Sequence, residues 1–313
     1  MLIEKSPKRT TAFARPVALF NRARDAFSAY LRALGPWHDE VVLLPAYVGW
    51  SPREGSGVLD PVSQLGLRYA FYALDDRLKI DVASVQRCLD QYPVRLFVII
   101  HFFGFIDPAY EEVVGLAQKV GVTVLEDEAH AMLTDLTTGR CGRLGDAALF
   151  SLHKLLPVPL GGALVLNTDR GASAAHEGLP IDHIPLPWSA DLFGISGRRR
   201  DNYWYLQARL KDLEQDVTIL RPLSYEVPQS MPVLIKTASR DMLYAAMNDA
   251  GYGCVSLYHT LVSDIDKAAF PSAHAVSRRI FNLPVHQDVM PEQLDRLVDC
   301  LAENIIMLGA SGR

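Results

Sequence analysis

Short apolar segments recur through the first half of the chain, and longer amphipathic segments separate them. Several of the short segments are apolar at every position instead of alternating between apolar and polar residues. This pattern is typical of strands that are covered on both faces of a sheet. The predicted strands are Glu40–Pro45, Tyr69–Leu74, Leu96–His101, Val122–Glu126, Ala147–Ser151 and Gly162–Leu166.

The segments between these strands carry helix signals. Asn21–Leu34 places its large apolar side chains on one face, as an amphipathic helix does. Asp81 is suited to cap a helix over Asp81–Leu89, and a third helix opens at Pro108 and stops at Gly121. Strands that alternate with helices predict an α/β fold with a mostly parallel central sheet and helices on both faces.

The pattern changes after about residue 166. Residues 170–197 are rich in Gly, Pro, Ser and His and predict a loop or linker. The elements predicted beyond it are helices over Arg198–Leu213, Arg240–Asn248 and Pro291–Leu308 and a strand over Val233–Ile235. We therefore expect a large domain over residues 1–195 and a smaller C-terminal α+β domain over residues 196–313.

Composition narrows the class of protein. The 313 residues are 49% hydrophobic and 21% charged, which excludes a disordered or fibrous chain. The formal net charge of −5 gives no reason to expect a nucleic-acid partner. The first residues, MLIEKSPKRT, are not followed by the apolar core of a signal peptide, and no apolar run approaches the ~20 residues of a membrane span. We expect a cytoplasmic protein without a membrane partner.

The four cysteines are widely separated in the sequence. None belongs to a CxxC pair or stands beside a histidine at metal-ligand spacing. We therefore expect reduced, mostly buried thiols and no metal site.

Residues that could carry chemistry follow four of the predicted strands. In an open parallel sheet the carboxyl ends of the strands meet at one edge, where ligands bind. The side chains expected at that edge are Tyr47 and Trp50, then His101, then Asp127, Glu128 and His130, and finally Ser151, His153 and Lys154.

Two local motifs point to other reactions. The segment VLEDEAH matches the DEAH box of nucleotide-driven helicases, but the required upstream phosphate loop is missing, since no Gly-Lys dipeptide occurs in the chain. Ser151 and Lys154 match the S-x-x-K of penicillin-binding serine hydrolases. That motif needs a helix, which Pro157 and Pro159 oppose, and no S-D-N accompanies it. The serine-hydrolase interpretation stays a minor alternative.

A pyridoxal phosphate enzyme accounts for more of these residues. It needs a lysine for the Schiff base and a carboxylate that keeps the pyridine nitrogen protonated. Lys154 and Asp127 meet these needs, and Ser151 can donate to the phosphate. The start of the Asn21–Leu34 helix, including Arg22 and Arg24, can add backbone amides and positive charge.

Six segments together resemble the PLP-dependent nucleotide-sugar aminotransferases of the DegT/StrS type, which have the fold-type-I architecture. The segments are RARDAFSAYLRALG, EVVLLPAYVGW, IIHFFGFIDP, VLEDEAHAM, GRLGDAALFSLHK with Gly161-Gly162, and FNLPVHQDVMPEQLDRLVDCL. They span residues 20 to 308, and their combination, rather than any one of them, is typical of the family.

The resemblance implies a role for each candidate residue. Asp127 becomes the partner of the pyridine nitrogen, His130 the contact at the 3-hydroxyl side of the ring, Ser151 a phosphate ligand and Lys154 the Schiff-base lysine. Ala23 and Arg24 stand in the phosphate-binding segment, and Tyr47 or Trp50 would stack on the ring because the family's aromatic position falls on Gly49.

The resemblance also implies the reaction and the partners. We expect a PLP-dependent homodimer that transfers an amino group from an amino acid to a keto-sugar nucleotide or related ketone. The chain departs from the family pattern at two points: Lys154 follows Ser151 by three residues instead of five, and the S-G-T hydroxyls are replaced by Arg22, Ala23 and Arg24. A catalytically degenerate binding or regulatory protein and a PLP-dependent sugar dehydratase therefore remain alternatives.

Overall fold

The computed structural model describes residues 15–180 and 189–310. The segment MLIEKSPKRT and residues 181–188 of the predicted loop lie outside the described residues. Among those described, no helix combines the length and apolar content that a membrane crossing requires.

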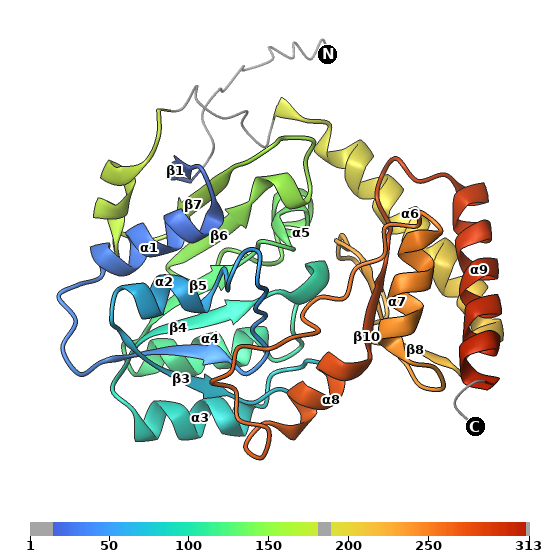
Figure 1. Cartoon of the computed structure of the whole chain (residues 1–313). Coiled ribbons are helices and arrows are strands. Elements are labelled where there is room, and N and C mark those ends of the chain that lie inside the picture. The colour runs from blue at the N-terminus through green and yellow to red at the C-terminus, as the bar shows by residue number, and fades with distance from the viewer. Residues whose placement is uncertain (1–14, 181–188, 311–313) are drawn as a thin grey trace, which may run out of the picture.

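A seven-stranded sheet forms the first half of the molecule (Figure 1). Its strands are β1 (Val17–Phe20), β2 (Val41–Pro45), β3 (Arg68–Tyr72), β4 (Val94–Ile100), β5 (Thr123–Asp127), β6 (Ala147–Ser151) and β7 (Gly162–Leu166). Their order is β1-β7-β6-β5-β4-β2-β3, and all neighbours from β6 to β3 are parallel. Only β7, beside β6, and β1, beside β7, run antiparallel to their neighbours. The predicted mostly parallel α/β sheet is confirmed.

Helices cover the sheet on both faces. They are α1 (Ala23–Ala33), α2 (Leu59–Gln64), α3 (Val82–Gln91) and α4 (Tyr110–Lys119), and the short α5 (Met132–Thr138) follows β5. Helix α2 connects β2 to β3, which is the edge strand. Helix α3 connects β3 to β4 and α4 connects β4 to β5, both in the opposite direction across the sheet. Right-handed crossovers in opposite directions place their helices on opposite faces, so α1 and α2 pack together on one face and α3 and α4 on the other.

The predicted helix ends have the expected causes. The Asp81 carboxylate accepts the backbone N–H of Ser84 at 3.0 Å and so caps α3. After α4 the chain turns at Gly121, whose φ of +75° is unfavourable for other residues.

The C-terminal half contains a three-stranded antiparallel sheet and four helices of the described chain (Figure 1). Its elements are α6 (Leu192–Arg209), β8 (Val217–Ile219), β9 (Met231–Ile235), α7 (Arg240–Asp249), α8 (Pro271–Arg279), β10 (Ile280–Leu283) and α9 (Pro291–Ala310). Helix α6 starts earlier than predicted because Asp191 caps it through the N–H of Gly194. It therefore runs through the predicted domain boundary at 195/196.

One segment of the C-terminal half returns to the large sheet. Gly49 and Leu261 form an antiparallel bridge just beyond β2, and the N–H of Val262 donates to the carbonyl of Val48 at 2.9 Å. The loop between α7 and α8 is thereby fixed at the carboxyl end of β2, next to the ends of β4 and β5.

Candidate active site

The residues singled out in the sequence gather at the carboxyl ends of the parallel strands. The chain passes from β2 outward to β3 and then back through β4, β5 and β6, so its connections diverge between β2 and β4. Ligands of open α/β sheets bind beyond the strand ends at such a switch point. Asp127 ends β5, Ser151 ends β6, and Lys154 ends the 3-10 turn η2 (Leu152–Lys154) that follows β6.

Lys154 brings an amine to this edge of the sheet. Its Nζ lies 3.2 Å from Nε2 of His130. The two residues after it, Leu155 and Leu156, are buried and hold the turn in place. Burial lowers the pKa of Lys154 below 10.5, although the negative charge of Asp127 acts in the opposite direction. The amine is therefore shifted toward its neutral, nucleophilic form.

His130 is positioned by hydrogen bonds at both ring nitrogens. Its Nδ1 accepts the backbone N–H of Phe103 at 3.2 Å, and the Phe103 ring stacks on the imidazole at 5.9 Å with an angle of 10°. Burial, with the charge of Lys154, holds the pKa of His130 well below 6.5. The imidazole is therefore neutral, and the hydrogen bonds assign its proton to Nε2. With its proton on Nε2, the imidazole can donate to Lys154 when the amine is neutral.

Asp127 supplies a buried carboxylate on the neighbouring strand. Its Oδ1 accepts the backbone N–H of Ala129 at 2.9 Å. Burial raises the pKa of Asp127 above 3.8, while that hydrogen bond and the charge of Lys154 lower it. The charges of Asp127 and Lys154 thus influence each other, yet no direct ion pair joins these two described side chains. Each can contact a molecule placed between them.

The start of α1 lies beside β7. A Cβ at Gly162 would lie 2.3 Å from the carbonyl carbon of Arg22 and 2.5 Å from the nitrogen of Ala23. Only a glycine therefore allows the helix to start so close to the strand. The N–H of Asp25 donates to the carbonyl oxygen of Arg22 at 3.1 Å, whereas those of Ala23 and Arg24 precede the intrahelical hydrogen bonds and can bind an anion.

Ser151 and Arg24 differ in how they are placed. Ser151 is 2% exposed and is the residue that leads into η2. The Arg24 guanidinium turns toward the segment after β2, where Nη1 donates to the carbonyl oxygen of Glu54 at 2.7 Å and lies 4.0 Å from Asp60 Oδ2.

The two aromatic residues predicted after β2 have unlike environments. Tyr47 is fully buried, and its hydroxyl donates to the carbonyl oxygen of Leu257 at 2.9 Å. Its ring is packed edge-on against Phe102 at 5.5 Å. Trp50 is 44% exposed. Tyr47 is thus enclosed by protein atoms, whereas nearly half of the Trp50 surface is exposed.

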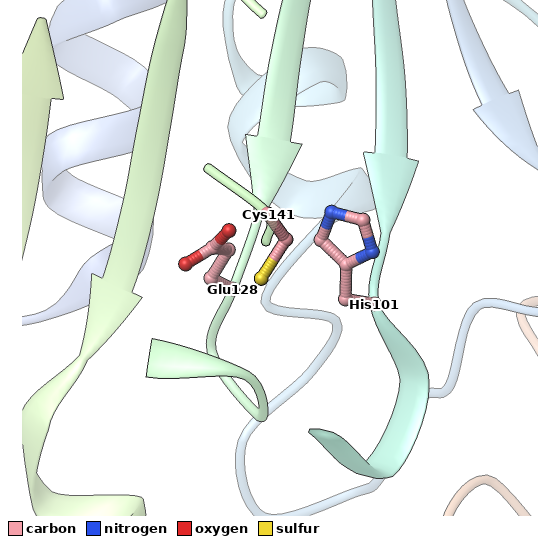
Figure 2. Close-up of side chains that lie close together, drawn as sticks. All are labelled: His101, Glu128 and Cys141. Atoms are coloured by element: carbon pink, nitrogen blue, oxygen red, sulfur yellow. The ribbon is translucent and has the colours of Figure 1, made fainter. Parts of the chain in front are cut away.

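Two further carboxylates flank Asp127 and lie in a buried polar cluster. Glu126 accepts hydrogen bonds from Nε2 of His101 and from the Tyr110 hydroxyl, at 3.0 and 2.7 Å. Glu128, His101 and Cys141 lie together (Figure 2). Each offers one atom that could bind a metal ion, and these three atoms lie within 4.8 Å of one another. The sequence spacing of the cysteines gave no indication of this group, because its members follow three different strands or turns.

Glu128 differs sharply from Glu126 although both are buried. Both carboxylate oxygens of Glu128 lack a hydrogen-bond partner among the described residues. Burial, followed by the negative charges of Asp135 and Glu126, raises the pKa of Glu128 well above 4.5. The folded protein therefore holds the Glu128 proton more tightly than the unfolded chain does.

The raised pKa of Glu128 predicts that Glu128→Gln stabilises the protein by an amount that depends on pH. A group whose pKa is raised on folding stabilises the protein below its unfolded pKa of about 4.5 and loses that contribution as the pH rises through the folded pKa. The amide cannot ionise, so the variant should match the wild type near pH 5 and exceed it at pH 8 by about 1–3 kcal/mol. Thermal unfolding from pH 5 to 8 measures the difference, and a difference that does not grow with pH would contradict the assignment.

Comparison with known proteins agrees with this arrangement. The model of the DegT/DnrJ/EryC1/StrS aminotransferase family matches residues 15–177 and 191–302. The chain belongs to this family. One relative, the UDP-N-acetyl-3-dehydro-α-D-glucosamine 3-aminotransferase of Acidithiobacillus ferrooxidans, is 21% identical over 90% of this chain and 82% of that protein.

Solved structures of the same fold include two further relatives of this DegT/StrS-type protein. Helicobacter pylori PseC, an aminotransferase of pseudoaminic acid biosynthesis, matches with a TM-score of 0.75 and 15% identity over 93% of this chain and 87% of that one. The Escherichia coli GDP-4-keto-6-deoxy-D-mannose-3-dehydratase, which holds hydrated PLP, matches with a TM-score of 0.73 and 17% identity over 91% and 87% of the two chains. The fold-type-I prediction is confirmed, and the protein is an enzyme of the PLP-dependent aminotransferase kind.

The residues of this chain fit pyridoxal phosphate. A half-buried amine and a buried carboxylate stand at neighbouring strand ends without pairing directly. The start of α1 offers backbone N–H groups to a phosphate, and Gly162 is the residue whose missing side chain permits its position. The sequence analysis did not identify Phe103, which contacts His130, or Glu126, which is hydrogen-bonded to His101.

Proposed function

We propose that this protein transfers an amino group from an amino acid to a keto-sugar nucleotide or a related ketone. The observation that carries the proposal is the half-buried Lys154 amine, hydrogen-bonded to His130 and electrostatically linked to Asp127. The sugar aminotransferases among its relatives support the substrate class. A homodimer is part of the same proposal.

Each residue has a separate task in this reaction. Bound pyridoxal phosphate supplies an aldehyde that condenses with amines and a ring that accepts electrons. We assign Lys154 to hold the cofactor and then to carry a proton between the substrate carbon and the cofactor. Asp127 would set its carboxylate beside the ring nitrogen, and His130 would position the Lys154 amine. Ser151 and the backbone N–H groups of Ala23 and Arg24 bind the phosphate.

A direct experiment separates this proposal from its alternatives. The purified protein is incubated with PLP, a UDP- or TDP-linked keto sugar and glutamate, and the nucleotide product is identified by mass spectrometry. An amino sugar formed at the expense of glutamate is the expected product. A deoxy sugar formed without net amino transfer would identify a dehydratase. Absence of any PLP binding by the folded protein would identify a degenerate binding protein instead.

A further inference from the structure

The turn that follows β2 lacks a side chain at the point nearest the site. Gly49 is fully buried, and the space where its side chain would lie is already filled. A Cβ at Gly49 would stand 1.9 Å from Cδ1, 2.5 Å from Cγ and 2.8 Å from Cβ of Tyr258. A ring from the C-terminal half of the chain thus occupies the place that a side chain at position 49 would take.

The backbone around Tyr258 is tied to the turn after β2. The Tyr258 N–H donates to the hydroxyl oxygen of Tyr47 at 3.3 Å, and that hydroxyl in turn donates to the carbonyl oxygen of Leu257 at 2.9 Å. Farther along, the N–H of Trp50 donates to the carbonyl oxygen of Thr260 at 3.0 Å. These bonds fix where the ring enters the site.

The Tyr258 ring lies beside the side chains that are assigned to the cofactor. It lies nearly parallel to the His130 imidazole, at 6.1 Å and 22°, and His130 contacts the Lys154 amine. It meets Tyr47 edge-on at 5.7 Å and 68°. The negative charge of Asp127, together with burial, raises the pKa of Tyr258, so the two side chains are close. The tyrosine is only partly buried and keeps accessible surface.

We propose that Tyr258 is the aromatic side chain on which the pyridine ring of the cofactor packs, in place of the side chain that Gly49 lacks. The proposal rests on the proposed function, because it needs PLP between Asp127 and Lys154. Packing of two flat rings in offset or edge contact stabilises beyond the area that they bury. The C-terminal half then supplies one wall of the cofactor site, and the two residues expected to stack, Tyr47 and Trp50, do not.

The test uses pyridoxamine 5′-phosphate, which cannot bond covalently to Lys154 and so reports the non-covalent contacts. Its affinity for the full-length protein is measured by titration calorimetry. Tyr258→Ala should weaken binding about 10-fold, and Tyr258→Phe, which keeps the ring, should stay within about 3-fold of the wild type. Tyr244→Ala removes an exposed tyrosine on α7 and serves as the matched control with unchanged affinity.

Gly49→Ala in the otherwise unchanged protein keeps the test informative if Tyr258→Ala is unstable. Gly49→Ala should weaken binding when Tyr258 is present, because the added methyl group displaces its ring. In the Tyr258→Ala background the same substitution should cost nothing further, and Gly49→Phe should recover part of the lost affinity. Thermal unfolding of each variant shows that the compared proteins are folded.

Three results would overturn the inference. They are unchanged or tighter binding by Tyr258→Ala, equal losses for Tyr258→Ala and Tyr258→Phe, or a loss in Trp50→Ala that matches the loss in Tyr258→Ala. Tighter binding would mean that the tyrosine fills the cofactor's own place. Failure of the wild type to bind pyridoxamine 5′-phosphate would instead reject the proposed function, so the two failures are distinguishable.

Discussion

Lys154→Ala is expected to lower the rate of amino transfer by about 1,000-fold or more. Lys154 has two proposed tasks, to hold the cofactor and to move a proton. A positioned acid–base group alone raises a reaction rate by roughly 10²–10⁴-fold. Among the other described lysines, Lys119, Lys211, Lys236 and Lys267 are exposed, and Lys79 follows β3 at the edge of the sheet.

The measurement pairs activity with the chemistry of the cofactor. Wild-type protein incubated with PLP should show an absorbance band that borohydride fixes covalently onto Lys154, located by peptide mass spectrometry. The band and the fixed adduct should both disappear in Lys154→Ala, whereas Lys267→Ala, which removes an exposed lysine, should retain them.

A small amine distinguishes a missing functional group from a damaged fold. Methylamine can enter the space left by Lys154→Ala and should restore part of the proton-transfer rate, with a dependence on the concentration of its neutral form. Lys154→Arg keeps a positive charge near Asp127 but offers no neutral amine, so it should be as inactive as the alanine variant. Activity of Lys154→Arg near the wild-type level would contradict the assigned role.

The position of this site could be predicted because it depends on local patterns. Strands β6 and β7 have the bounds that their apolar runs predict. Parallel strands bring their carboxyl ends to one edge, so residues that end β5 and β6 meet there without any knowledge of distant contacts. The 3.2 Å approach of Lys154 to His130 follows from that register and from the short turn η2.

Contacts between distant parts of the chain could not be predicted from local sequence patterns. Tyr47 and Tyr258 are 211 positions apart, and nothing around Tyr258 marks it as a site residue. The one available signal was the glycine at position 49, where an aromatic side chain was expected. Strand β1 was missed for a related reason, since its four residues become a strand only by pairing with the distant β7.

Glu126→Gln is expected to cost about 3–5 kcal/mol of stability, because at least two hydrogen-bond donors lose their acceptor in the protein interior. The Glu126 carboxylate is fully buried and accepts five hydrogen bonds. Three come from the backbone N–H groups of Gly142, Gly145 and Leu144, at 2.6, 2.7 and 3.1 Å. The hydrogen bonds from His101 and Tyr110 and those from this turn outweigh burial and lower the pKa of Glu126, so it is ionised in the folded protein.

The loss has a specific physical origin. A glutamine has the same shape, but one of its two positions is an NH₂ group that faces backbone N–H donors instead of accepting from them. At least two buried donors then lose their partner, and each such loss costs about 1–3 kcal/mol. The turn over residues 142–145 should loosen with it, because its backbone is held by this one carboxylate.

Glu128→Gln is the matched control for Glu126→Gln. It lies two residues away, its side chain is also buried, and the substitution changes the same atoms. No described N–H or O–H group donates to either Glu128 oxygen, and the neighbouring Cys141 thiol is only a weak donor, so the amide there disrupts little. Denaturant unfolding at pH 7 should therefore rank the variants with Glu126→Gln far below the wild type and Glu128→Gln at or above it. Equal losses at the two positions would show that burial alone, and not the hydrogen bonds of Glu126, sets the cost, and would reject the division of roles between these neighbouring acids.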